Sequence, residues 1–105
     1  MRRETCLMPL FCLHCLDNET DGAERRAVTR PAHLEWAAGL GEAMRMAGPL
    51  LSDDGRMIGS VFLIEAASLD EAHAIHATDP YTKGGVFGRT TINETRWAIG
   101  AGRPE

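Results

Sequence analysis

Residues 59–66 read GSVFLIEA, and this stretch decides the fold. From Val61 to Ile64 every residue is β-branched, aromatic or aliphatic, which is typical of a strand. Residues 9–16 (PLFCLHCL) are also apolar at nearly every position and end in the polar run DNETDG. A strand with one face in water alternates apolar and polar residues. The two stretches therefore predict two strands of a sheet that is covered on both faces.

Two helices are predicted around these strands. Over residues 31–46, apolar and mostly small residues recur at helical spacing, and Pro31 suits a first helical turn because its φ is fixed and it lacks an N–H. A second helix would begin after Ser68, with Glu71 at the spacing of a capping box. It would end before Pro80, because proline disfavours the helical conformation in the residue that precedes it.

Two further stretches complete a four-stranded pattern. Residues 46–51 (MAGPLL) predict a short strand, and residues 88–100 predict a last, more polar one. The order β-α-β-β-α-β is typical of an α+β, ferredoxin-like βαββαβ fold, in which both helices cover one face of an antiparallel sheet. The chain has no further element for the other face. We therefore expect a second copy to cover it, sheet against sheet, in a dimeric α+β barrel.

Chain direction in this topology brings distant residues to one edge of the sheet. His33 at the start of the first helix, Ser60 at the start of its strand and Asp79 at the end of the second helix meet there. A carboxylate on one imidazole nitrogen fixes the tautomer and stabilises the imidazolium, while the other nitrogen transfers a proton. Ser60 would donate to a developing oxyanion. Trp36 and Tyr81 would form an aromatic wall for a small ligand.

Four stretches along the chain resemble the YciI-like (YCII-related) domain family. The resemblance runs from about residue 8 to residue 100, and the stretches that carry it are RPAHLEW (30–36), AGPLLSDDG (47–55), IGSVFLIEA (58–66) and DPYTKGGVF (79–87). It implies a ferredoxin-like subunit that dimerises as an α+β barrel. It also implies a catalytic pair at the positions of His33 and Asp79, and Ser60 lies on a further motif. The family is linked to dehydrochlorination of a chlorinated hydroxyquinone, although most members have no assigned substrate.

These observations lead us to expect a small enzyme that needs no metal and no organic cofactor. His33 would act as general base and acid, and Asp79 would orient it. The reaction would be an isomerisation or an elimination on a small cyclic or carbonyl compound, which makes the protein a lyase or an isomerase. The alternative is a non-catalytic module that binds a small ligand or regulates through the same pocket. A purely structural dimer is a third possibility.

Three other groups of residues have both a functional and a structural interpretation. Lys83 either binds an anionic group of the substrate or is a solvated loop lysine. His73 and His76 have a spacing that metal sites use, but surface positions on a helix explain them better. Cys12 and Cys15 are three positions apart and so would lie on opposite faces of a strand, which favours two core thiols over a zinc or redox pair.

Composition and charge exclude several classes of protein. The 105 residues are enough for one domain, which we place at residues 8–100, with a flexible extension (1–7) and a tail (101–105). The net charge is −4 without any basic block, which argues against a nucleic-acid partner. No apolar run approaches the ~20 residues that cross a bilayer, so we expect no membrane partner. Three cysteines, an odd number, favour a reducing compartment, the cytoplasm.

Overall fold

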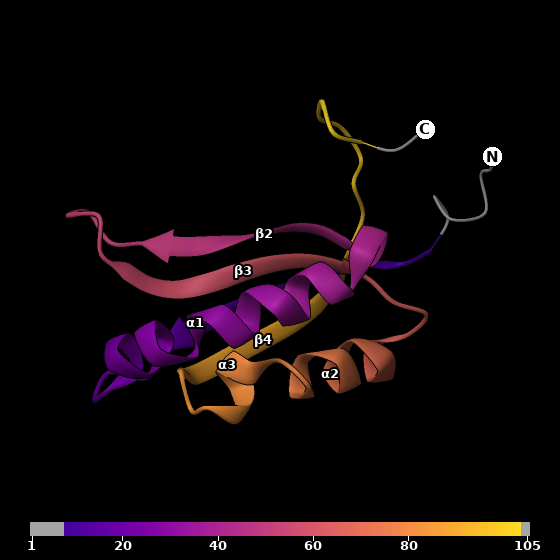
Figure 1. The fold of residues 1–105 in the computed structure, drawn as a ribbon. Coiled ribbons are helices and arrows are strands. Elements are labelled where there is room, and N and C mark those ends of the chain that lie inside the picture. The colour runs from indigo at the N-terminus through magenta and orange to yellow at the C-terminus, as the bar shows by residue number, and fades with distance from the viewer. Residues whose placement is uncertain (1–7, 104–105) are drawn as a thin grey trace.

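Four strands form one antiparallel sheet in the order β2-β3-β1-β4 (Figure 1). The computed structural model describes residues 8–103, so the predicted extension (1–7) lies outside the described residues. The strands are β1 (Leu10–Asp17), β2 (Met44–Leu51), β3 (Met57–Glu65) and β4 (Phe87–Thr95). The helices are α1 (Gly22–Gly39), α2 (Leu69–Ala77), the short α3 (Pro80–Lys83) and a 3-10 turn, η2 (Gly41–Ala43). This is the predicted α+β, ferredoxin-like arrangement, with α3 as an additional element.

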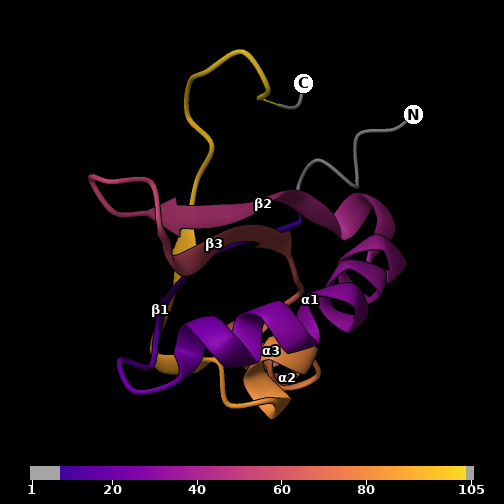
Figure 2. The same cartoon turned by 60° about the vertical axis from the view of Figure 1, so that its left-hand side comes forward.

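The helices all lie on one side of the sheet (Figure 2). Alternate residues of the two central strands face them and form the core, in which Phe11, Leu13, Cys15, Phe62 and Ile64 are at most 1% exposed. Burying side chains of this size stabilises a fold by about 1.5–3 kcal/mol each. Since both central strands contribute to this core, the register between them also sets where their ends meet the helices.

The side of the sheet that faces away from the helices is partly apolar: β4 and His14 contribute exposed polar side chains to it, whereas most other residues of the central strands there are apolar. In β1 and β3 it carries Cys12, Leu16, Val61 and Leu63, all half-buried. From Val61 to Ile64, β3 lacks the polar alternation of a strand with one wet face, as predicted, whereas the exposed His14 interrupts the apolar run in β1. Within residues 8–103, none of the helices covers this side.

The two cysteines of the CLHC stretch point to opposite sides of the sheet. Cys12 lies on the side without helices, whereas Cys15 is fully buried in the core. Burial raises the pKa of the Cys15 thiol to about 11. A thiol that stays protonated is a poor nucleophile and a poor metal ligand.

The first helix differs from its prediction: it begins at Gly22 rather than at Pro31 and ends at Gly39 rather than at residue 46. Pro31 therefore lies inside α1, where it removes one backbone hydrogen bond. Arg26 and His33, on either side of the proline, are both buried against the rest of the protein, and this packing compensates for the lost bond. His33 consequently lies in the second half of a long helix, and the helix N-terminus does not act on it.

The second helix begins as predicted, because the Ser68 hydroxyl accepts a hydrogen bond from the Glu71 N–H (3.1 Å). It ends at Ala77, and Asp79 is not its last residue but the N-cap of α3. The last strand is shorter than predicted and ends at Thr95. None of the helices in the described part of the chain is long and apolar enough to cross a membrane.

Candidate active site

His33 and Asp79, 46 positions apart in the sequence, are hydrogen-bonded. His33 Nδ1 lies 2.8 Å from Asp79 Oδ1, and the two residues are 6% and 0% exposed. The same carboxylate oxygen accepts the backbone N–H of Tyr81 (2.9 Å). Pro80 follows Asp79 and keeps it extended, at φ −64° and ψ 125°, so that the carboxylate turns back over the start of α3. The chain direction at this junction thus brings the acid to the histidine.

This contact defines the roles of the two imidazole nitrogens. An ionised carboxylate only accepts hydrogen bonds, so this contact favours the neutral tautomer in which Nδ1 donates and Nε2 holds the lone pair. No residue of the described chain forms a hydrogen bond with Nε2. The one fully buried side-chain oxygen or nitrogen without a partner in residues 8–103 is Asp79 Oδ2. His33 is therefore the only side chain of the described chain that hydrogen-bonds to this carboxylate, and its second nitrogen remains free for proton transfer.

Aromatic rings hold the imidazole in one plane. The Tyr81 ring stacks on it, with 3.8 Å between centroids and 9° between planes. Trp36 and Phe62 pack around it at 5.6 and 5.7 Å. Trp36 is itself fixed by its indole N–H, which donates to Thr78 Oγ1 (2.8 Å). Of the two residues predicted to form an aromatic wall for a ligand, Tyr81 lines the cavity that lies beside His33, whereas Trp36 flanks the histidine without lining it.

A second buried polar group lies beside this pair. The Arg26 guanidinium forms two hydrogen bonds with Asp17, from Nε to Oδ2 (2.9 Å) and from Nη2 to Oδ1 (2.7 Å). Nη2 also donates to Ser60 Oγ at 2.9 Å. Both charged side chains are less than 10% exposed. Ser60 is thus hydrogen-bonded to a cation that a carboxylate holds in place.

Arg26 is not among the predicted site residues, because the first helix was expected to begin only at Pro31. Once the helix begins at Gly22, Arg26, Arg30 and His33 are spaced i, i+4, i+7, which places all three on one helix face. That spacing was the signal that could have found the residue.

Arg26 and Tyr81 connect the two polar groups. The guanidinium carbon of Arg26 lies 4.8 Å from the centroid of the Tyr81 ring, which also stacks on His33. Burial raises the pKa of the Tyr81 phenol, and the nearby charges of Arg26 and Arg30 act in the opposite direction. The phenol is therefore a neutral hydrogen-bonding group at neutral pH.

A cavity of about 160 Å³ lies between α1, β2, β3 and α3. Its lining is mostly apolar and carries no carboxylate. The polar or aromatic residues that line it are Arg26, Arg30, His33, Ser60, Phe62 and Tyr81. The remaining lining residues are Leu34, Ala37, Ala47, Gly48, Pro49 and Met57.

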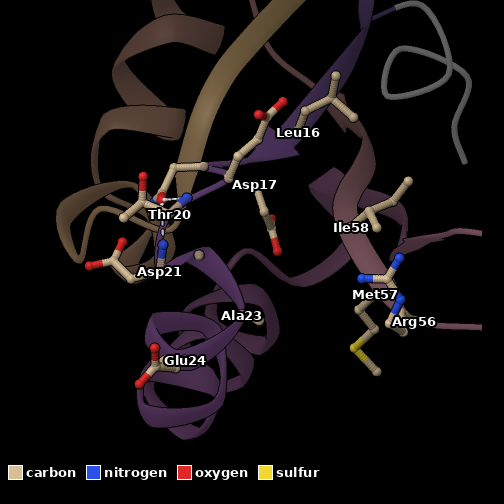
Figure 3. A pocket seen from close by; sticks show the side chains of 12 residues that line it. Leu16, Asp17, Thr20, Asp21, Ala23, Glu24, Arg56, Met57 and Ile58 are labelled. Atoms are coloured by element: carbon tan, nitrogen blue, oxygen red, sulfur yellow. Dashed lines mark hydrogen bonds between the residues drawn. The ribbon is translucent and has the colours of Figure 1, made fainter.

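A larger hollow of about 510 Å³ adjoins this cavity at the start of α1 (Figure 3). Figure 3 shows Asp17, Asp21 and Glu24 along one side of it and Arg56 and Met57 along the other. Met57 lines both spaces. No histidine and no cysteine line this hollow, so His33 and its proton-transfer chemistry belong to the smaller cavity.

The remaining candidate residues lie away from the cavity. Lys83 is exposed at the end of α3 and does not line it. His73 is exposed, and His76 stacks on Phe87 with Thr82 Oγ1 about 3.3 Å from one ring nitrogen. Burial lowers the pKa of His76. No group of three or more histidine, cysteine or acidic side chains that could hold a metal occurs in residues 8–103.

The fold and the site together define an α+β protein with a buried histidine–aspartate pair beside a cavity of small-molecule size. The YCII-related domain matches residues 9–96, so the chain belongs to this family. No curated protein sequence matches the chain.

The solved structures that match this chain include the following two. The 5-chloro-2-hydroxyhydroquinone dehydrochlorinase TftG from Burkholderia phenoliruptrix AC1100, solved with 2,5-dihydroxybenzoquinone, is 33% identical, with a TM-score of 0.74 over 87% of this chain and 95% of that chain. An uncharacterised NIPSNAP domain protein from Burkholderia xenovorans is 13% identical, with a TM-score of 0.47 over 85% of this chain and 93% of that chain.

Proposed function

We propose that this protein is a small-molecule enzyme in which His33 and Asp79 transfer a proton without a metal or an organic cofactor. The reaction is an isomerisation or an elimination on a small cyclic or carbonyl compound. One observation carries the proposal: a buried imidazole that lines the cavity is hydrogen-bonded to a carboxylate through Nδ1 (2.8 Å) and keeps Nε2 free.

The chemistry follows from the contacts of each side chain. Nε2 of His33 takes a proton from an acidic C–H or O–H of the substrate, and the electron pair of the broken bond stays on the substrate as an enolate or a phenolate, with the negative charge on oxygen. Asp79 stabilises the imidazolium. Ser60 accepts a hydrogen bond from Arg26, so its own O–H is available to donate to that oxygen. The imidazolium then returns the proton to another atom in an isomerisation, or a leaving group departs with its electron pair in an elimination.

The similarity to TftG supports the elimination. TftG is a dehydrochlorinase, an enzyme that removes hydrogen chloride from its substrate, and it covers 87% of this chain at 33% identity. Its bound 2,5-dihydroxybenzoquinone is a single six-membered ring. A cavity of about 150 Å³ in another protein holds benzene, so the space of about 160 Å³ beside His33 suits a ligand with one ring.

Chloride release from 5-chloro-2-hydroxyhydroquinone, kept under anaerobic conditions, tests the proposal. We expect the wild-type protein to release chloride and His33→Ala to do so about 10²–10⁴-fold more slowly, since the variant lacks the base. His73→Ala is the matched control, because His73 is exposed on α2 and does not line the cavity. Near-normal release by His33→Ala contradicts the mechanism. Binding without release by the wild type favours the alternative, a non-catalytic ligand-binding or regulatory module.

The proposal includes a homodimer in the cytoplasm. Half-buried apolar side chains, among them Val61 and Leu63, occupy the side of the sheet without helices, and a second copy would remove them from water. Cys12 and Cys15 point to opposite sides of the sheet and so cannot form a disulfide with each other, which suits a reducing compartment.

Light scattering coupled to size exclusion measures the assembly. We expect a dimer for the wild type and a monomer for Leu63→Asp, because a buried charge without a partner is strongly unfavourable. His73→Asp, on the exposed side of α2, should remain dimeric. Circular dichroism confirms that each variant is folded. A monomeric wild type contradicts the dimer.

A further inference from the structure

We propose that the cavity selects a one-ring ligand that carries negative charge on oxygen, and that Arg30 is the residue that determines this specificity. The inference rests on the proposed function only in that both concern the same cavity. It names the chemical class of the ligand, and it assigns a role to a side chain outside the His33–Asp79 pair.

The charges around the cavity are unevenly balanced. Two arginines and a histidine line it, and no aspartate or glutamate does. The charge of Arg26 is compensated by Asp17 through two hydrogen bonds. Arg30 forms no ion pair and no hydrogen bond with any residue of the described chain. The cavity therefore has one cation without a counter-charge.

The position of Arg30 suits a ligand contact. It lies one turn after Arg26 and one turn before His33 on the same face of α1. It is exposed and still lines the cavity, so it stands at the mouth. An exposed guanidinium keeps its donors free, and it binds oxyanions with charge-assisted hydrogen bonds.

A second donor lies deeper in the same space. Ser60 is 3% exposed, and Nη2 of Arg26 occupies one lone pair of its hydroxyl oxygen. The Ser60 proton has no acceptor within residues 8–103. A ring with two oxygen substituents would meet Ser60 with one of them and Arg30 with the other. A neutral ring would keep the first contact and lose most of the second.

The lining also distinguishes Arg30 from the other cation that the sequence suggests. Lys83 is exposed as well, but it lies at the end of α3 and does not line the cavity. If charge at the cavity matters, neutralising Arg30 will change the affinity and neutralising Lys83 will not. The two positions therefore form a matched pair, each losing one positive charge from an exposed side chain.

Calorimetric titration with two probes tests the inference. The first is 2,5-dihydroxybenzoquinone, whose hydroxyl groups are acidic enough to ionise at neutral pH, and the second is hydroquinone, which is neutral there. We expect the wild type to prefer the ionised probe. Arg30→Gln should lower the affinity for the ionised probe by about tenfold to a hundredfold and leave the affinity for hydroquinone unchanged. Arg30→Lys should recover part of the affinity, and Lys83→Gln should leave both probes unchanged.

Several outcomes would overturn the inference. The inference is wrong if Arg30→Gln binds the ionised probe as tightly as the wild type does, or if this variant loses affinity for both probes equally. It is equally wrong if Lys83→Gln is the variant that loses affinity. It is also wrong if the wild type binds neither probe. Binding requires no proton transfer, so none of these results depends on whether His33→Ala still releases chloride. The inference and the proposed function can therefore fail separately.

Discussion

Asp79→Asn is expected to lower turnover by about 10²–10³-fold while the protein stays folded. The amide is nearly isosteric with the carboxylate but carries no charge. The imidazolium that forms when His33 takes a proton would then lose its counter-charge. Its formation becomes less favourable, and the rate falls with it.

The geometry of Asp79 explains why Asp79→Asn should lose less turnover than His33→Ala. Its Oδ1 accepts both Nδ1–H of His33 and the Tyr81 N–H. An asparagine that turned its amide nitrogen to this position would place two donors against each other at Tyr81. The amide oxygen should therefore keep the position of Oδ1 and preserve the tautomer. The amide nitrogen would replace Oδ2, which is buried without a partner in the described chain.

Steady-state chloride release, measured beside the unfolding midpoint, checks this prediction. Asp53→Asn is the control, since Asp53 is exposed in the turn between β2 and β3. Because Asp79 acts through His33, the double variant His33→Ala, Asp79→Asn should be no slower than His33→Ala alone. Independent, additive losses would show that Asp79 acts by another route.

Asp17→Asn is expected to lower the free energy of unfolding by about 3–5 kcal/mol. Arg26 and Asp17 are 7% and 8% exposed at their side chains and share two hydrogen bonds. Removing the carboxylate charge leaves a guanidinium that is buried and uncompensated. Ser60 and the face of the Tyr81 ring remain next to it, and neither carries a charge.

Urea denaturation measures this effect, and Asp21→Asn is the matched control. Asp21 pairs with Arg25 in the same region, but its pair is largely exposed and should change stability little. A double replacement, Asp17→Leu with Arg26→Met, should recover much of the lost stability, because replacing a buried pair costs less than breaking it. A loss in Asp17→Asn no larger than that of Asp21→Asn would show that the buried pair contributes little.

The order of strands and helices could be predicted from the sequence because it depends on local patterns. The apolar stretches around Phe11 and Phe62 predict buried strands, and this prediction does not depend on the exact residues at which each strand ends. Chain direction then brings the segments of His33 and Asp79 together. The predicted place of the pair, at the edge of the sheet, was wrong, because α1 begins at Gly22 and His33 in its second half packs against Phe62 of β3.

Other parts of the site depend on contacts between distant residues and could not be predicted in that way. Proline is common at the first position of a helix, so local preference favoured a start at Pro31. It could not show that α1 extends back to Gly22, where Arg26 packs against Asp17 and Ser60. The choice between Arg30 and Lys83 as the cation at the cavity has the same origin. It depends on the rotation of α1 about its axis, which only its packing on the sheet determines.

The three cationic or basic side chains of the cavity, Arg26, Arg30 and His33, all belong to α1. The carboxylates that hydrogen-bond to two of them come from other segments: Asp17 holds Arg26, and Asp79 holds His33. Grafting this helix alone onto a relative would transfer the bases and leave their acids behind. A recipient would accept the graft only if it already had an aspartate at the end of its first strand and another before its short third helix. In this fold α1, Asp17 and Asp79 would therefore have to be transferred together, even though they are separate in the chain.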